Sequence, residues 1–123
     1  MLEHKHIVIR AKVKKPPKNV DETTVWFKNL IKHIGMNLLM GPIGTYLDKE
    51  GNRGLTMVAI IETSHIAMHV WDEQNPALVQ LDVYTCGALN PDDVFDYLQK
   101  FEPVDVKYMV LDREHEIDIK ELR

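Results

Sequence analysis

The sequence predicts an α+β two-layer sandwich, in which an antiparallel sheet carries two helices on one face. Its 123 residues are the size of one domain, so residues 1–123 are expected to form a single unit. Six short apolar segments have the length or alternation of strands, and two longer segments repeat their apolar residues at helical spacing. Their order, with a helix after the first strand and before the last, is typical of this class.

The first strand is expected over residues 6–13, because apolar side chains alternate there with polar ones. Pro16 and Pro17 end it. Asp21 is predicted to be the N-cap of the first helix, and Gly35 supplies its left-handed stop. The apolar stripe expected to face the core comprises Val25, Phe27, Leu30, Ile31 and Ile34.

The middle of the chain predicts strands joined by short polar turns. Residues 36–40 are a short apolar run, residues 41–44 are expected to turn, and the polar segment 48–54 is a hairpin loop. Residues 55–61 are strongly apolar and too few for a buried helix, which favours a central strand. Residues 66–71 and 78–84 are expected to form two more strands around a turn at 72–76.

The second helix is predicted from its capping residues. Asn90 precedes Pro91, and this pair is typical of a helix N-terminus. Pro103 ends the segment, residues 104–111 are expected to form the last strand, and residues 112–123 are a charged tail. The buried stripe of this helix is predicted to comprise Val94, Phe95, Leu98 and Phe101.

Composition excludes several classes of protein. The chain is 45% hydrophobic and 28% charged, which indicates a folded domain rather than a disordered one. It has neither an uncharged apolar stretch of about 20 residues nor the layout of a signal peptide, so a cytoplasmic protein with no membrane contact is expected. Its one cysteine, Cys86, excludes an internal disulfide and a CxxC motif.

The positive charge is concentrated at the start of the chain. Residues 1–20 carry six basic side chains and one acidic side chain, although the whole chain has a net charge of −4. Such an arm can contact phosphates, but lysines more commonly solvate an edge strand and the loop after it. We therefore expect an edge strand here, and no nucleic-acid partner.

Reactive side chains gather in two segments, ETSHIAMHVWDE at residues 62–73 and DVYTCG at residues 82–87. Because side chains on one face of a strand recur every second residue, four of them would line one surface of the sheet. These four are His65, His69, Trp71 and Glu73.

Three interpretations of these residues remain open on chemistry alone. One is a metal site formed by His65, His69 and either Cys86 or Glu73. Another is a nucleophilic cysteine–histidine pair that includes Cys86. In the third, Ser64 and His65 simply form a turn, while Cys86 and Trp71 pack in the core.

The two segments together resemble the small prokaryotic S-adenosylmethionine decarboxylases. That family carries Glu-Ser-His, then a short strand leading to His-Thr-Trp-Pro-Glu, then Asp-Val-Phe-Thr-Cys-Gly. The matching stretches here are TSHIAMHVW, Glu73 and LDVYTCG, and the resemblance spans roughly residues 54–101. Two linked motifs at matched separation are a specific signal. Thr63 departs from the pattern, because the family has glutamate before its serine.

The resemblance implies an enzyme that makes its pyruvoyl cofactor from its own backbone. Ser64 would attack the carbonyl of Thr63, and cleavage between these two residues would leave the pyruvoyl group at position 64. His69 is similar by position to the family's processing base, and Thr56 to a hydroxyl residue that aids processing. No metal is implied.

The resemblance also implies the reaction and the assembly. The pyruvoyl group would accept the amine of S-adenosylmethionine and take up electrons as carbon dioxide leaves, for spermidine synthesis. Cys86 is similar to the family's proton donor, whereas Trp71, Glu73 and His65 resemble residues of the substrate side. A homodimer is expected. The alternative is an uncleaved, non-catalytic relative that binds a ligand or a partner.

Overall fold

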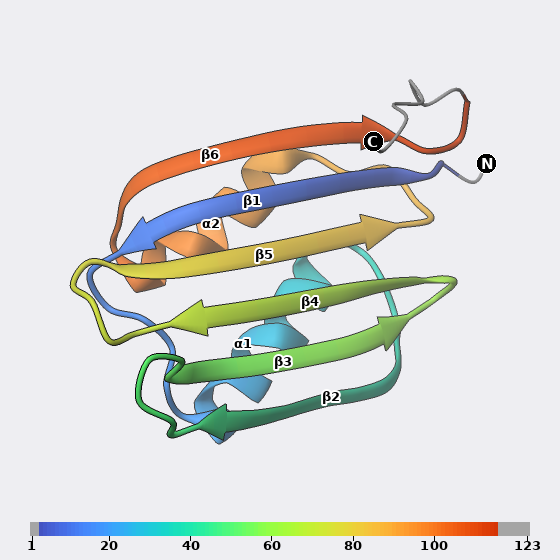
Figure 1. The fold of residues 1–123 in the computed structure, drawn as a ribbon. Helices are drawn as coiled ribbons and strands as arrows, with labels where there is room; N and C mark the ends of the chain where they lie inside the picture. Colours follow the sequence, from blue (N-terminus) through green and yellow to red (C-terminus); the bar gives the residue numbers. More distant parts are fainter. Residues whose placement is uncertain (1–2, 116–123) are drawn as a thin grey trace, which may run out of the picture.

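The computed structural model describes residues 3–115 as six strands and two helices, with a short 3-10 turn after the second helix (Figure 1). The sheet is antiparallel throughout, and both helices lie on one of its faces, which confirms the predicted α+β sandwich. The elements in chain order are β1 (Lys5–Val13), α1 (Val20–His33), β2 (Leu38–Leu47), β3 (Gly54–Ile61), β4 (Ser64–Trp71), β5 (Ala77–Thr85), α2 (Pro91–Leu98), η1 (Gln99–Phe101) and β6 (Pro103–Asp112).

The strand order is β2-β3-β4-β5-β1-β6, which makes β1 an interior strand. The predicted edge strand is therefore wrong, because β6 returns along β1 and pairs with it from Lys5 opposite Asp112 onward. Lysines of the basic arm form ion pairs with this returning part of the chain. Lys5 Nζ lies 3.1 Å from Asp112 Oδ2, and Lys15 Nζ lies 2.8 Å from Glu102 Oε2.

The first helix begins one residue after Asn19, whose side chain accepts a hydrogen bond from the Glu22 amide at 2.9 Å. Asp21 is therefore not the N-cap, although its carboxylate in the first turn favours the helix dipole. The predicted stripe is wrong at Val25, which is 57% exposed, whereas Trp26 is buried and donates a hydrogen bond to the Tyr97 carbonyl.

The predicted turn at residues 41–44 is wrong, because these residues lie inside β2. The register of β2 against β3 shifts between Leu38 and Met40 and again between Met40 and Ile43, and the pairing then continues to Leu47. Gly44 allows the backbone of β2 to lie close to β3, since a Cβ atom at position 44 would lie 2.9 Å from the Thr56 carbonyl oxygen. Glycine in a strand thus indicates close backbone contact rather than a chain reversal.

The second helix begins as predicted, with Asn90 accepting a hydrogen bond from the Asp92 amide and Pro91 in the first turn. Its regular part ends at Leu98, and η1 carries the chain on to the buried Phe101. Phe95 is only partly buried, and its ring packs against Tyr108 of β6. Of the predicted charged tail, residues 116–123 lie outside the described residues.

The face of the sheet opposite the helices, called here the open face, exposes many apolar side chains. β1 and β6 present Val8 and Met109 in register, and β2 and β3 present Ile43 opposite Val58. These side chains are between 40% and 70% exposed. Within residues 3–115, neither helix is long and apolar enough to span a bilayer.

Candidate active site

The predicted cleavage position lies in a tight turn between β3 and β4. The turn consists of Glu62 and Thr63, because Ile61 already pairs with Ser64 across the two strands. Thr63 has a φ of 44°, in the left-handed region that favours glycine or asparagine. A β-branched residue held in this region stores roughly 1–3 kcal/mol of backbone strain. The strain lies at the residue whose carbonyl Ser64 is expected to attack.

Ser64 and Cys86 approach the same backbone oxygen. The Ser64 hydroxyl donates a hydrogen bond to the Glu62 carbonyl at 2.7 Å, and the Cys86 thiol donates to that oxygen at 2.9 Å. Both residues are buried, with 8% and 5% of their surface exposed. Antiparallel pairing explains the meeting, because β4 begins beside the end of β5. The structure therefore brings together these two residues of the predicted site.

A neighbouring asparagine holds the turn at two points. The Asn37 carbonyl accepts a hydrogen bond from the Glu62 amide at 3.2 Å, and the Asn37 side-chain amide donates to the Glu62 carboxylate. These contacts link the turn to the segment between α1 and β2. Because Glu62 is fixed in this way, its carbonyl oxygen is a stable acceptor for both the hydroxyl and the thiol.

His69 does not lie near Ser64 within one chain. The two residues are on the same strand, five positions apart and with side chains on opposite faces, which places them roughly 16 Å apart at the usual rise per residue. His69 lies on the open face, where its Nδ1 is 2.9 Å from the hydroxyl oxygen of Thr56, its cross-strand partner. The structure thus pairs the two predicted processing residues with each other rather than with the serine.

Trp71 is the last residue of β4, and Glu73 lies beyond it in the turn that follows, so the expected face of four strand residues does not include Glu73. The Trp71 indole donates a hydrogen bond to Asn52 at 3.0 Å, and the Glu73 carboxylate accepts one from the Arg53 amide at 3.0 Å. Both residues line a shallow depression of about 460 Å³. The Asp48 carboxylate, hydrogen-bonded to the Arg53 guanidinium, raises the pKa of that guanidinium and keeps a fixed positive charge at the depression.

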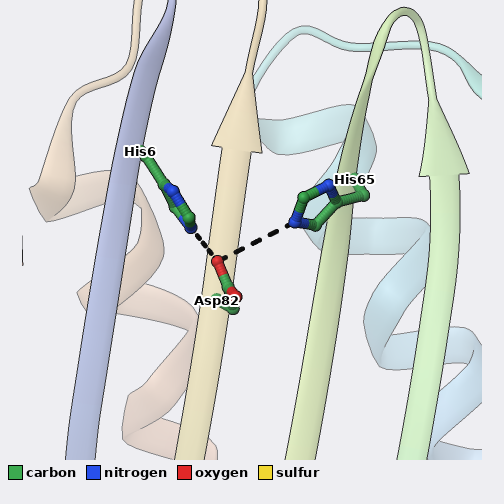
Figure 2. Close-up of side chains that lie close together, drawn as sticks. All are labelled: His6, His65 and Asp82. Carbon is green, nitrogen blue, oxygen red and sulfur yellow. Dashed lines mark hydrogen bonds and ion pairs between the residues drawn. The ribbon is translucent and has the colours of Figure 1, made fainter. Parts of the chain in front are cut away.

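His65 also lies on the open face, but in a different group of side chains. Figure 2 shows His6 of β1 and His65 of β4 pointing towards the carboxylate of Asp82, which lies on β5 between them. The metal set considered from the sequence is not assembled: His69 belongs to the Thr56 pair, and the hydrogen bond of Cys86 goes to Glu62.

Sequence reasoning did not identify His6 or Asn37 as site residues. His6 was assigned only to a strand, and its proximity to His65 depends on β1 pairing with β5, which no local pattern reveals. Asp82 is the first residue of the DVYTCG motif, and sequence reasoning gave it no role. Its position on the same strand face as Tyr84, two residues on, was the signal that could have found it.

The fold is similar to that of a solved structure described as the adenosylmethionine decarboxylase from Aquifex aeolicus VF5. The TM-score is 0.70, the match covers 98% of each chain, and the sequences are 20% identical. At that level of identity the likeness concerns the fold alone.

Relatives in sequence are described as decarboxylase proenzymes. An S-adenosylmethionine decarboxylase proenzyme from Archaeoglobus fulgidus is 28% identical over 70% of this chain and 77% of its own length. One from Pyrobaculum neutrophilum is 41% identical over 63% of this chain, and the match spans 61% of that relative's length. A protein from Hyperthermus butylicus described as an arginine decarboxylase proenzyme is 34% identical over 64% of this chain and 59% of its own.

The family model described as S-adenosylmethionine decarboxylase matches residues 13–114, a range that includes Ser64, Cys86 and the strained turn between β3 and β4. The chain therefore belongs to the S-adenosylmethionine decarboxylase family.

Proposed function

We propose that this protein is a pyruvoyl-dependent decarboxylase of S-adenosylmethionine that becomes active by cleaving itself between Thr63 and Ser64. The observation that carries the proposal is the meeting of the Ser64 hydroxyl and the Cys86 thiol on one carbonyl oxygen, beside a strained peptide. Two nucleophilic groups at a strained turn are more than the packing of a sheet requires.

The cleavage chemistry follows from the turn. The Ser64 oxygen attacks the Thr63 carbonyl carbon, the peptide C–N bond breaks, and an ester joins Thr63 to the serine oxygen while the amine of residue 64 becomes free. Elimination then removes the Cα proton of residue 64 and breaks the bond between its Cβ and the ester oxygen, so that Thr63 ends in a carboxylate. The enamine left on residue 64 becomes an imine, and water replaces its nitrogen, which releases ammonia and leaves a ketone. Movement out of the left-handed region favours the first step, because it releases backbone strain.

The residues around Ser64 fit a pyruvoyl group. The position is buried beside a thiol, so water has restricted access to it. When formed, the group supplies an electron sink for decarboxylation. Cys86 is assigned as the residue that protonates the product after carbon dioxide leaves. Its Sγ is held near the cleavage point, 2.9 Å from the Glu62 carbonyl oxygen.

A homodimer is part of this proposal, since one chain does not assemble the whole site. The base His69 lies roughly 16 Å along β4 from Ser64, on the face that exposes the apolar side chains. A sheet face that exposes many large apolar side chains is typical of an interface. Packing two open faces about a two-fold axis would cover it, and would direct His69 of one chain towards the exposed turn at Thr63 of the other.

Intact-mass spectrometry of the purified chain tests the cleavage. We expect two fragments of about half the full mass, with the second reacting with a hydrazine, whereas Ser64→Ala stays whole. A wild-type chain that stays whole and does not react with hydrazine would indicate the alternative, an uncleaved family member that binds a ligand or a partner.

Mixing variants tests the shared site. Ser64→Ala and His69→Ala chains should each remain whole alone, but co-expression should cleave the His69→Ala chain, because its partner supplies the missing imidazole. Cleavage of His69→Ala alone, or none in the mixture, would contradict this arrangement.

Release of carbon dioxide from labelled S-adenosylmethionine and from labelled arginine tests the substrate. The relative described as an arginine decarboxylase proenzyme makes arginine the necessary comparison. We expect release from S-adenosylmethionine and none from arginine.

A further inference from the structure

Three adjacent strands bring two imidazoles and a carboxylate to one point on the open face. In the register of the sheet, His6 of β1 and His65 of β4 both lie opposite Tyr84 of β5, one on each side of it. Asp82 is two residues from Tyr84 and so lies on the same face. The proposed cleavage chemistry uses neither His6 nor Asp82.

The side chains converge rather than merely share a face (Figure 2). His6 Nε2 contacts Asp82 Oδ1, His65 Nε2 lies 4.0 Å from that oxygen, and the imidazole rings are 6.0 Å apart at an interplanar angle of 84°. One atom from each residue lies within 4.8 Å of the other two, and all three residues are partly buried. A metal ion about 2.0–2.2 Å from each of these atoms would need only small rotations of the side chains.

We propose that His6, His65 and Asp82 bind a divalent transition-metal ion of the zinc class. Two nitrogen ligands favour such an ion over magnesium or calcium, which prefer oxygen. Three protein ligands leave the fourth tetrahedral position for water or another ligand.

Arg113 should weaken the binding of the metal, because it interacts with the ligand His6. Its guanidinium nitrogen lies 3.3 Å from His6 Nδ1, and because arginine is always a donor, this contact requires the hydrogen of a neutral imidazole to be on Nε2. A metal on Nε2 requires the other tautomer, with the hydrogen on Nδ1. Binding therefore displaces Arg113, and Arg113→Gln should bind the metal more tightly than the wild-type chain.

The ligands lie on both sides of the proposed cleavage point. His6 belongs to residues 1–63, whereas His65 and Asp82 belong to residues 64–123. A bound metal would link the two fragments after cleavage, and this consequence rests on the proposed function. The metal site itself does not, because the uncleaved chain contains all three ligands.

Calorimetric titration of the full Ser64→Ala chain with Zn²⁺ tests the site independently of cleavage. We expect one ion per chain, with affinity reduced about tenfold or more by His65→Gln, His6→Gln or Asp82→Asn. His65→Gln is the most informative variant, because 45% of the His65 side chain is exposed and its replacement leaves the core intact.

His33→Gln is the matched control, since His33 lies near Asp93 and Asp96 in a separate group on the helices. It should bind Zn²⁺ like the parent chain. Absence of Zn²⁺ binding by the parent would overturn the proposal, as would binding that survives His65→Gln and is lost in His33→Gln. Circular dichroism of each variant checks that weaker binding does not reflect unfolding.

Discussion

Replacing Thr63 with glycine should slow self-cleavage, because it removes the strain at the peptide that breaks. Thr63 has a φ of 44°, a conformation that costs a β-branched residue roughly 1–3 kcal/mol and glycine almost nothing. If this strain is released in the transition state, its removal raises the barrier by the same amount. At about 1.4 kcal/mol per tenfold change, cleavage should slow by about 5- to 150-fold.

The same substitution should stabilise the uncleaved chain. The strain relief of about 1–3 kcal/mol is offset by about 0.5–1 kcal/mol, because glycine loses more conformational entropy on folding. A net gain of about 0–2.5 kcal/mol in the free energy of unfolding is expected. Denaturant titration of Thr63→Gly against its parent, both carrying Ser64→Ala, measures this gain without interference from cleavage.

Thr63→Val is the matched control for the rate. Valine keeps the branched Cβ, and hence the strain, but lacks the hydroxyl. A time course of intact mass should show Thr63→Val cleaving at nearly the wild-type rate and Thr63→Gly lagging behind. A glycine variant that cleaves as fast as the wild-type chain would refute the role of strain, and a slow valine variant would assign the effect to the hydroxyl.

Three further predictions concern the fold. Phe27→Ala should lower the free energy of unfolding by about 3–5 kcal/mol in denaturant titration, because Phe27 is fully buried; a loss below about 1 kcal/mol would contradict this packing. Gly54→Ala should destabilise far more than the usual point substitution of about 1 kcal/mol, since a Cβ there would lie 1.6 Å from the Val70 carbonyl oxygen; an unchanged melting temperature would refute the contact. The Asp112 carboxylate raises the pKa of His115, so the stabilisation from this pair is present at low pH, where the imidazole is charged, and is lost as the pH rises through the raised pKa. Proton NMR should show the pKa of His115 above its ordinary value, and Asp112→Asn should reduce that difference, of which Glu114 supplies the remainder.

Much of the fold could be predicted from local patterns. The alternation in β1 and the caps around α2 depend on residues close together in the sequence, so these two elements were located to within a few residues. The turn predicted at residues 41–44 failed for a physical reason. Gly41 and Gly44 serve close packing against β3, and glycine alone does not distinguish a turn from a close contact.

Some features of the candidate site could likewise be predicted from the sequence, and others could not. The motif around Ser64 and Cys86 was visible in the sequence, and antiparallel pairing of neighbouring strands was enough to bring these residues together. The strain at Thr63 was not visible, because threonine does not itself favour a positive φ.

The sequence by itself determined the class of the fold, the family and the residue at which the chain is proposed to break, because each is recorded in residues that are neighbours or lie at fixed spacing. Only the tertiary structure decided that β1 lies inside the sheet, that His6 meets His65 and Asp82, and that His69 pairs with Thr56. Pairing between strands distant in the sequence follows from burying one face of the whole sheet at once. That requirement belongs to the assembled core rather than to any single segment.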